Sequence, residues 1–221
     1  MTTQQIRQTG SALVATLLLL TLGGTASATF VTPDAYQMWQ RADPSSTYQE
    51  WDVWTTIGSA ADVANVNPNG NAAVSQSVPG AVMVAGSGNL YAMGGDPSFS
   101  IVIPDFDSPS HTTSVLLQIE TIGNEFVPGT VLINGQAPGY SVEFGNTEVP
   151  GYGGGTMSVI ETLFTWNGLT TGSDITIEFD GTQNMSLSRL SVDTSTVPEP
   201  GTALLMLIGL TGLACQGRRK A

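Results

Sequence analysis

The single histidine and the single cysteine of this chain exclude several kinds of catalytic site. His111 follows a polar stretch that begins at Asp107, and no Gly-x-Ser-x-Gly sequence is present to hold the nucleophile of a Ser-His-Asp triad. Cys215 lies in an apolar run near the C-terminus, so the rest of the chain has no thiol for a zinc cluster, a disulfide or nucleophilic catalysis. We therefore expect that the protein is not an enzyme.

Carboxylates are the reactive groups that this chain has in abundance. A pair of them could hydrolyse glycosides, but no spacing in the sequence singles out an acid and a nucleophile. Calcium prefers carboxylate and carbonyl oxygens, and Asp105, Asp107 and Asp180 are candidate ligands because they lie in an expected loop or precede a glycine. No complete ligand loop is present, and solvated loop acids are the alternative for these residues. We therefore expect no cofactor, and calcium is the only one left open.

Aromatic side chains are candidates for sugar binding, since an exposed ring offers a flat apolar face and a polar edge. Trp51 and Trp54 would lie on opposite faces of one strand, so at least one of them could lie outside the core. The candidates for contact with sugar are Trp54, Tyr140, Tyr152 and Trp166. Packing inside the fold is the alternative for each ring.

The charge of the chain restricts its partners. The region 29–197 has seventeen acidic residues and only two cations, Arg41 and Arg189, which gives a net charge of about −15. Such a surface repels nucleic acid and anionic lipid, so we expect no nucleic-acid partner. The same charge would also keep a secreted protein soluble.

The elements that position these residues are expected to be short β-strands. Apolar residues alternate with polar ones most clearly over 114–122, where Val115, Leu117 and Ile119 would face a core. Similar runs, bounded by turn-forming residues, occupy 48–54, 81–85, 99–103, 130–133, 158–166 and 175–179. Over 185–192 the alternation changes parity around Ser188 and Arg189, which predicts a β-bulge there.

Eight to ten such strands predict an all-β fold, an antiparallel β-sandwich of jelly-roll type, with a closed barrel as the rival. Asn134-Gly135 and Asn167-Gly168 are typical of tight turns between antiparallel strands. One short helix is expected after Thr32, with Pro33 at its first position and its end near Gln40. The fold only broadly resembles the jelly-roll modules that bind carbohydrate, and this is a likeness of architecture alone.

The N-terminus has the features of a secretory signal peptide. Arg7 precedes an apolar run over 12–22, and Ala26-Ser27-Ala28 then supplies small residues for cleavage. The apolar run rises about 16 Å as a helix, which is roughly half of the hydrocarbon core of a bilayer. We therefore expect cleavage after Ala28, with Ala26 and Ala28 as the recognised residues, and an exported product.

The C-terminus combines four features in a fixed order. Val197 is followed by Pro198-Glu199-Pro200, then by an apolar run over 203–215 and by the basic end Arg218, Arg219 and Lys220. Prolines on both sides of a glutamate favour an extended, accessible segment. The basic end would stay on the cytoplasmic side of a membrane and leave the rest of the chain outside.

These features resemble the PEP-CTERM sorting signal of Gram-negative and related bacteria. The resemblance implies processing near Pro198, Glu199 and Pro200 by an exosortase-like membrane enzyme in bacteria that make extracellular polysaccharide. It also implies that Arg218, Arg219 and Lys220 retain the chain in the membrane until it is cut. The alternative is a plain C-terminal anchor, for which the apolar run is short.

The expected organisation is therefore a signal helix over 1–28, a β-sandwich over 29–196 and a sorting tail over 197–221, with a short transmembrane helix at 202–217. Export to the cell envelope, the outer surface or an extracellular matrix follows, through a single-pass membrane intermediate. One hypothesis is a structural or adhesive protein. The alternative is a carbohydrate-binding module for extracellular polysaccharide.

Overall fold

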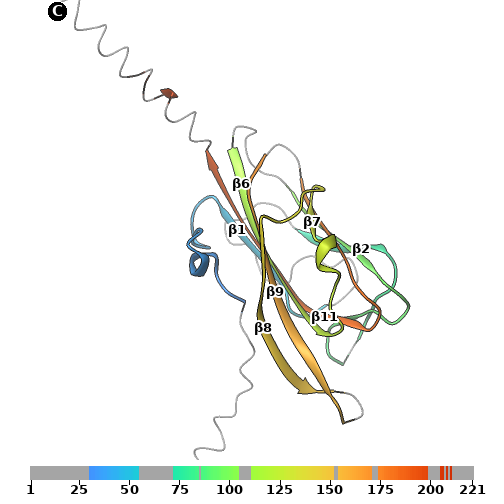
Figure 1. Ribbon diagram of the computed structural model, residues 1–221. Helices are drawn as coiled ribbons and strands as arrows, with labels where there is room; N and C mark the ends of the chain where they lie inside the picture. The colour runs from blue at the N-terminus through green and yellow to red at the C-terminus, as the bar shows by residue number, and fades with distance from the viewer. Residues whose placement is uncertain are drawn as a thin grey trace, which may run out of the picture.

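Two antiparallel sheets face each other in the computed structural model (Figure 1). The structure describes residues 30–54, 72–84, 86–104, 111–151, 154–170 and 174–198, together with residues 205, 206, 208 and 210. The strands that form the sheets run in alternating directions wherever they pair. The predicted all-β sandwich is confirmed, and the two separate sheets replace the rival closed barrel.

The larger sheet has seven strands, in the order β3-β4-β11-β6-β9-β8, with β1 paired to β11 along the same edge as β4. Their bounds are β1 (Ser46–Trp51), β3 (Val82–Met83), β4 (Leu90–Tyr91), β6 (His111–Gly123), β8 (Tyr140–Pro150), β9 (Thr156–Thr170) and β11 (Met185–Pro198). The smaller sheet has the order β2-β5-β10-β7, with bounds β2 (Ala73–Val78), β5 (Ser98–Ile103), β7 (Leu132–Ile133) and β10 (Ile175–Asp180). Two short 3-10 helices, η1 (Pro33–Tyr36) and η2 (Pro128–Thr130), complete the described elements.

The core lies between the sheets and is formed by the residues that alternation predicted. Val115, Leu117 and Ile119 of β6 are fully buried in it. On β11 the register shifts between Leu187 and Arg189, so one extra residue is absorbed and Leu187 and Leu190 both reach the core. The predicted β-bulge is confirmed, and its role is to keep one face of β11 apolar across the change of parity.

Three sequence expectations differ from the structure in detail. Asn167-Gly168 is not a turn but lies inside β9, where the register with β6 shifts and Gly168 adopts a φ of 71°. The helix after Pro33 is a 3-10 helix that ends at Tyr36, well before Gln40. Eleven strands are present in the described residues, because β2, β4 and β8 lack the clear alternation on which the count relied.

By contrast, Asn134 and Gly135 form the predicted tight turn, with φ angles of 47° and 77°. This turn follows β7 and contacts β10, since the Asn134 N–H donates to the Thr176 carbonyl and the Thr176 N–H donates to Asn134 Oδ1, both at 2.9 Å. The asparagine therefore accepts the left-handed backbone and also fastens the turn to the smaller sheet.

Candidate functional site

The final strand of the sandwich leads directly into the predicted sorting segment. Strand β11 pairs with β6 up to its last residue, with Val197 opposite Thr112 and Pro198 opposite His111. Thr196 is buried, and its N–H donates to the Ser45 carbonyl at 3.0 Å. The strand thus continues past residue 196, where the sandwich was expected to end, and Pro198 of the sorting motif is its last residue.

The remaining residues of the predicted sorting and cleavage motifs lie outside the described residues: Ala26, Ala28, Glu199, Pro200, Arg218, Arg219 and Lys220. Within the predicted transmembrane helix at 202–217, residues 205, 206, 208 and 210 are helical and exposed. None of the helices in the described part of the chain has the length and apolar character that a membrane crossing requires.

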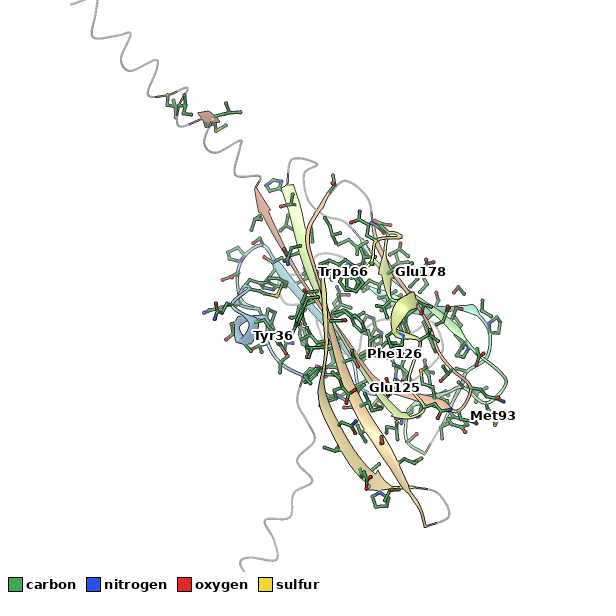
Figure 2. The ribbon with its side chains drawn as sticks, in the orientation of Figure 1. Tyr36, Met93, Glu125, Phe126, Trp166 and Glu178 are labelled. Atoms are coloured by element: carbon green, nitrogen blue, oxygen red, sulfur yellow. The ribbon has the colours of Figure 1, made fainter. Side chains whose placement is uncertain are left out.

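The face of the large sheet that points away from the core is covered by the segment 30–43, which contains η1 and is drawn in blue (Figure 1). Figure 2 shows Tyr36 on this outer side and Trp166 on the side of the core. Gln118 of β6 fixes the start of the segment with two hydrogen bonds of 2.9 Å, one accepted from the Val31 N–H and one donated to the Val31 carbonyl. Leu116, which faces outward beside Gln118, is consequently fully buried.

Arg41 fastens the other end of this segment to β11. Its guanidinium donates to both carboxylate oxygens of Asp193, at 2.7 and 3.0 Å, and lies 3.5 Å above the centre of the Tyr48 ring. The Asp193 side chain is fully buried. Burial raises the pKa of Asp193 to about 6, against the opposing effect of Arg41, which favours the charged form. This ion pair therefore has a large desolvation cost that its two hydrogen bonds offset.

The second cation of the sandwich, Arg189, lies beside a cluster of carboxylates on the same face. It donates to Glu50 Oε1 at 2.6 Å, approaches Glu120 Oε2 at 3.8 Å and lies over the Phe30 ring. Glu120 on β6 is directly opposite Glu161 on β9 and accepts a hydrogen bond of 2.6 Å from the Ser188 hydroxyl.

Glu161 is the carboxyl group in this cluster that favours protonation. Burial raises its pKa, and the charge of Glu120 raises it further. A Cβ atom at Gly145 would collide with the Glu161 carboxylate, so the glycine at this bulge in β8 makes room for it. Glu120 and Glu161 are 8% and 4% exposed, so a substrate has almost no access to the pair. We interpret the cluster as a structural tie between strands.

The four aromatic candidates for sugar binding occupy different environments. Trp54 and Trp166 are 1% and 2% exposed and belong to the core, so neither offers a ring face to a sugar. Trp54 stacks on Trp51, with ring centres 6.2 Å apart, and the indole N–H of Trp166 donates to the Gln136 carbonyl at 3.0 Å. Tyr140, at the start of β8 and not in a loop, is 50% exposed. Tyr152 lies outside the described residues.

The carboxylates considered for calcium are not gathered in the described part of the chain. Asp180 accepts a hydrogen bond of 2.5 Å from the Ser98 hydroxyl, and its N–H donates to Thr130 Oγ1. Asp105 and Asp107 lie outside the described residues. Among the residues that the structure describes, no three His, Cys, Asp or Glu side chains are grouped so that they could hold a metal ion.

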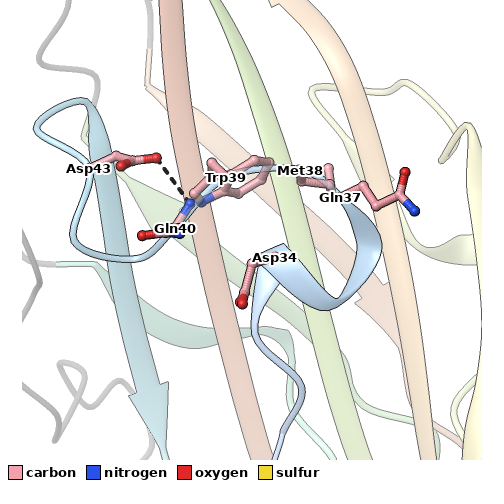
Figure 3. Close-up of a pocket in the computed structure, with 6 residues that line it drawn as sticks. All are labelled: Asp34, Gln37, Met38, Trp39, Gln40 and Asp43. Carbon is pink, nitrogen blue, oxygen red and sulfur yellow. Dashed lines mark hydrogen bonds between the residues drawn. The ribbon is translucent and has the colours of Figure 1, made fainter.

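A surface depression beside η1 contains residues that the sequence reasoning did not select. Its volume is about 530 Å³, and it is lined by Asp34, Gln37, Met38, Trp39, Gln40 and Asp43 (Figure 3). A second depression of about 400 Å³ shares Gln37, Met38 and Trp39 and extends over Ser114, Asn167 and Ser195 of the large sheet. Trp39 therefore lines both hollows.

The loop that holds Trp39 has a defined conformation. The Gln40 N–H donates to Asp43 Oδ2 at 3.0 Å, and Gln37 adopts the left-handed conformation with a φ of 58°. Trp39 is partly buried, and its indole N–H is enclosed without a hydrogen-bond partner among the described residues. The accessible part of the ring is consequently its carbon surface. Trp39 was missed because it lies where the helix after Pro33 was expected to end.

Comparison with known proteins identifies the C-terminal segment. Residues 196–220 match the PEP-CTERM protein-sorting motif. The motif identifies an exported protein of the cell envelope or surface that is sorted by exosortase, a membrane enzyme, and the resemblance noted in the sequence is confirmed. A comparison of the whole chain with curated proteins finds no match.

Proposed function

We propose that the β-sandwich of this exported protein acts as a structural or adhesive component of the cell surface or extracellular matrix, without enzymatic activity. The observation that carries the proposal is the junction between the fold and the sorting motif. The motif begins at residue 196, inside strand β11, which ends at Pro198. The sandwich is thus attached to its sorting segment through one of its own strands.

The position of β11 suits a protein that must resist force. One edge of β11 pairs with β6 along the whole strand. The other edge pairs with β1 from Leu190 to Ser195. While the sorting segment still holds the chain at the membrane, a pull on the C-terminal end of β11 acts along the strand, so it loads both rows of hydrogen bonds together. A domain attached through an edge strand would open one row alone.

The buried charges of the outer face support the same proposal. Arg41 and Arg189 link the N-terminal segment and strands β1, β6 and β11 through buried or partly buried carboxylates. These groups are engaged with one another, which leaves them poorly placed to act on a substrate. An acidic surface also keeps the sandwich dispersed until it reaches its destination.

A cell-cohesion experiment tests the proposal. Cells that lack the chain are compared with cells that produce it in its natural form or with Glu199→Ala, and the mechanical strength of the cell layer is measured by rheology. We expect the natural chain alone to restore cohesion. Equal cohesion with and without the chain would refute a structural or adhesive role.

Carbohydrate binding is the second candidate function. Tyr140 supports it, because its ring remains exposed on the large sheet. The depressions around Trp39 support it more specifically, since they combine an aromatic ring with amide, hydroxyl and carboxylate groups.

A further inference from the structure

We propose that the two depressions lined by Trp39 form a binding site for a neutral polysaccharide. The inference deepens the second candidate function, on which it rests, and it names both the site and the class of ligand. Sugar rings would lie against the carbon surface of Trp39, with their hydroxyl groups bonded to the polar side chains on both sides.

The aromatic surface is suited to a sugar ring. The indole N–H of Trp39 is enclosed, so the part of the ring that reaches the depressions is apolar. The C–H face of a hexose packs on such a surface, and burying it releases water from both partners. Tyr36 lines the second depression, and the exposed Tyr140 lies near it, which extends the aromatic surface toward β8.

The polar side chains around Trp39 match the hydroxyl groups of a sugar. Gln37 and Gln40 each present an amide that both donates and accepts, while Asp34 and Asp43 accept. The second depression adds the amide of Asn167 and the hydroxyl groups of Ser114 and Ser195. Adjacent hydroxyl groups need this mixture of donors and acceptors, because each hydroxyl both donates and accepts.

The charges select a neutral ligand over an anionic one. Among the residues that the structure describes, no cation lines either depression, whereas Asp34 and Asp43 line the first. Arg41 and Arg189, the only cations between residues 29 and 197, are held in ion pairs with Asp193 and Glu50. An anionic polysaccharide would therefore meet a net charge of about −15 with no positive group to receive it.

The site is preorganised, which reduces the entropy cost of binding. Arg41, Gln118 and Asp43 hold the segment on both sides of Trp39 through hydrogen bonds to Asp193, Val31 and Gln40. The depressions have volumes of about 530 and 400 Å³ and are open to solvent, so a long polymer could lie across them without its ends being enclosed. Two adjoining hollows of this size suit consecutive rings of a polymer better than a single free sugar.

The test is affinity gel electrophoresis of the protein purified from the producing cells. The gels contain one of three neutral polymers, dextran, laminarin or hydroxyethylcellulose, or the anionic polymer alginate. We expect at least one neutral polymer to retard the protein while alginate does not. Trp39→Ala should weaken the retardation at least tenfold, and Gln40→Ala, which changes an exposed side chain, should weaken it a few-fold.

Tyr91→Ala is the matched aromatic control, because Tyr91 pairs with Ser186 at the far end of β11 from Ser195. It should leave retardation unchanged, and thermal unfolding confirms that each variant is folded. The proposal is overturned if no neutral polymer retards the protein, if alginate alone does, or if folded Trp39→Ala binds as the natural protein does. Equal retardation of the natural protein and of folded Trp39→Ala would refute this site alone, whereas no retardation by any polymer would refute carbohydrate binding itself. The cohesion experiment uses no Trp39 variant, so it tests the structural role separately.

Discussion

Removing Arg41 should destabilise the sandwich in a way that depends strongly on pH. The change Arg41→Met keeps much of the aliphatic stem of the side chain and removes the two hydrogen bonds, of 2.7 and 3.0 Å, that the guanidinium makes with Asp193. The Asp193 side chain is fully buried, so the substitution leaves a carboxylate without its cation. Breaking a buried ion pair from one side costs about 3–5 kcal/mol.

The pH dependence follows from the pKa of Asp193, which is raised to about 6 even with Arg41 present. Near pH 5 the carboxyl group is mostly protonated in both proteins, so the loss of the cation removes hydrogen bonds to a neutral group and should cost about 1 kcal/mol. Near pH 8 the natural protein holds a paired charge, whereas the variant must bury an unpaired charge or take up a proton. If the pKa rises by about two units, half of the variant is protonated at pH 8, and the extra cost there is roughly 2 kcal/mol.

Urea unfolding at pH 5 and pH 8 measures this difference in the free energy of unfolding. In thermal unfolding at pH 8, the variant should melt about 6–12 °C below the natural protein. The double variant Arg41→Met/Asp193→Asn is the control, since it has no carboxyl group to titrate at this position. Its destabilisation should be the same at both pH values. An equal loss of stability at pH 5 and pH 8 for Arg41→Met alone would refute the reasoning.

Three further outcomes are expected. Trp166→Ala should lower the free energy of unfolding by about 3–5 kcal/mol, whereas Tyr140→Ala should change it by less than about 0.5 kcal/mol, as chemical denaturation will show. Gly168→Ala should lower the free energy of unfolding by about 1–2 kcal/mol through its positive φ alone, because a Cβ there meets no atom within 4 Å. Gly129→Ala is the control, since that position is equally open but has no positive φ, and it should cost far less. The free energy of unfolding of the natural protein should rise by roughly 1.4 kcal/mol between pH 8 and pH 5 through Asp193, because the folded chain binds a proton at this carboxyl group more tightly than the unfolded chain does. This stabilisation is complete below the unfolded pKa and is lost as pH rises through 6. Lower stability at pH 5 than at pH 8 would contradict the assigned direction.

The sequence predicted those parts of the fold that depend on local alternation. Ser114 to Ile122 lies within β6, and the parity change near Ser188 became a bulge, because one face of each strand must remain apolar. Strand β8 was not predicted, because its two faces do not differ in hydrophobicity. Most of its side chains are exposed on both faces, so hydrophobicity does not alternate along it.

The candidate site was harder to predict because it depends on contacts between distant residues. Alternation places Trp54 opposite Trp51, but β1 ends at Trp51 and the chain then bends, so both rings enter the core. The cover over the outer face is held by Arg41 and Asp193, which are 152 residues apart. No local pattern reveals such a pairing. Trp39 belongs to the segment 30–43, so its place on the outer face depends on how that segment is held.

The most direct test of the account is the intact mass of the protein recovered from outside the producing cells. The sorting motif begins at residue 196 and β11 ends at Pro198, so we expect the processing point just beyond the fold. We expect a mass that begins near residue 29 and ends near residues 197–201, and we expect Glu199→Ala to abolish this product. A mass that extends through Ala221, or one that the variant leaves unchanged, would contradict sorting through this motif.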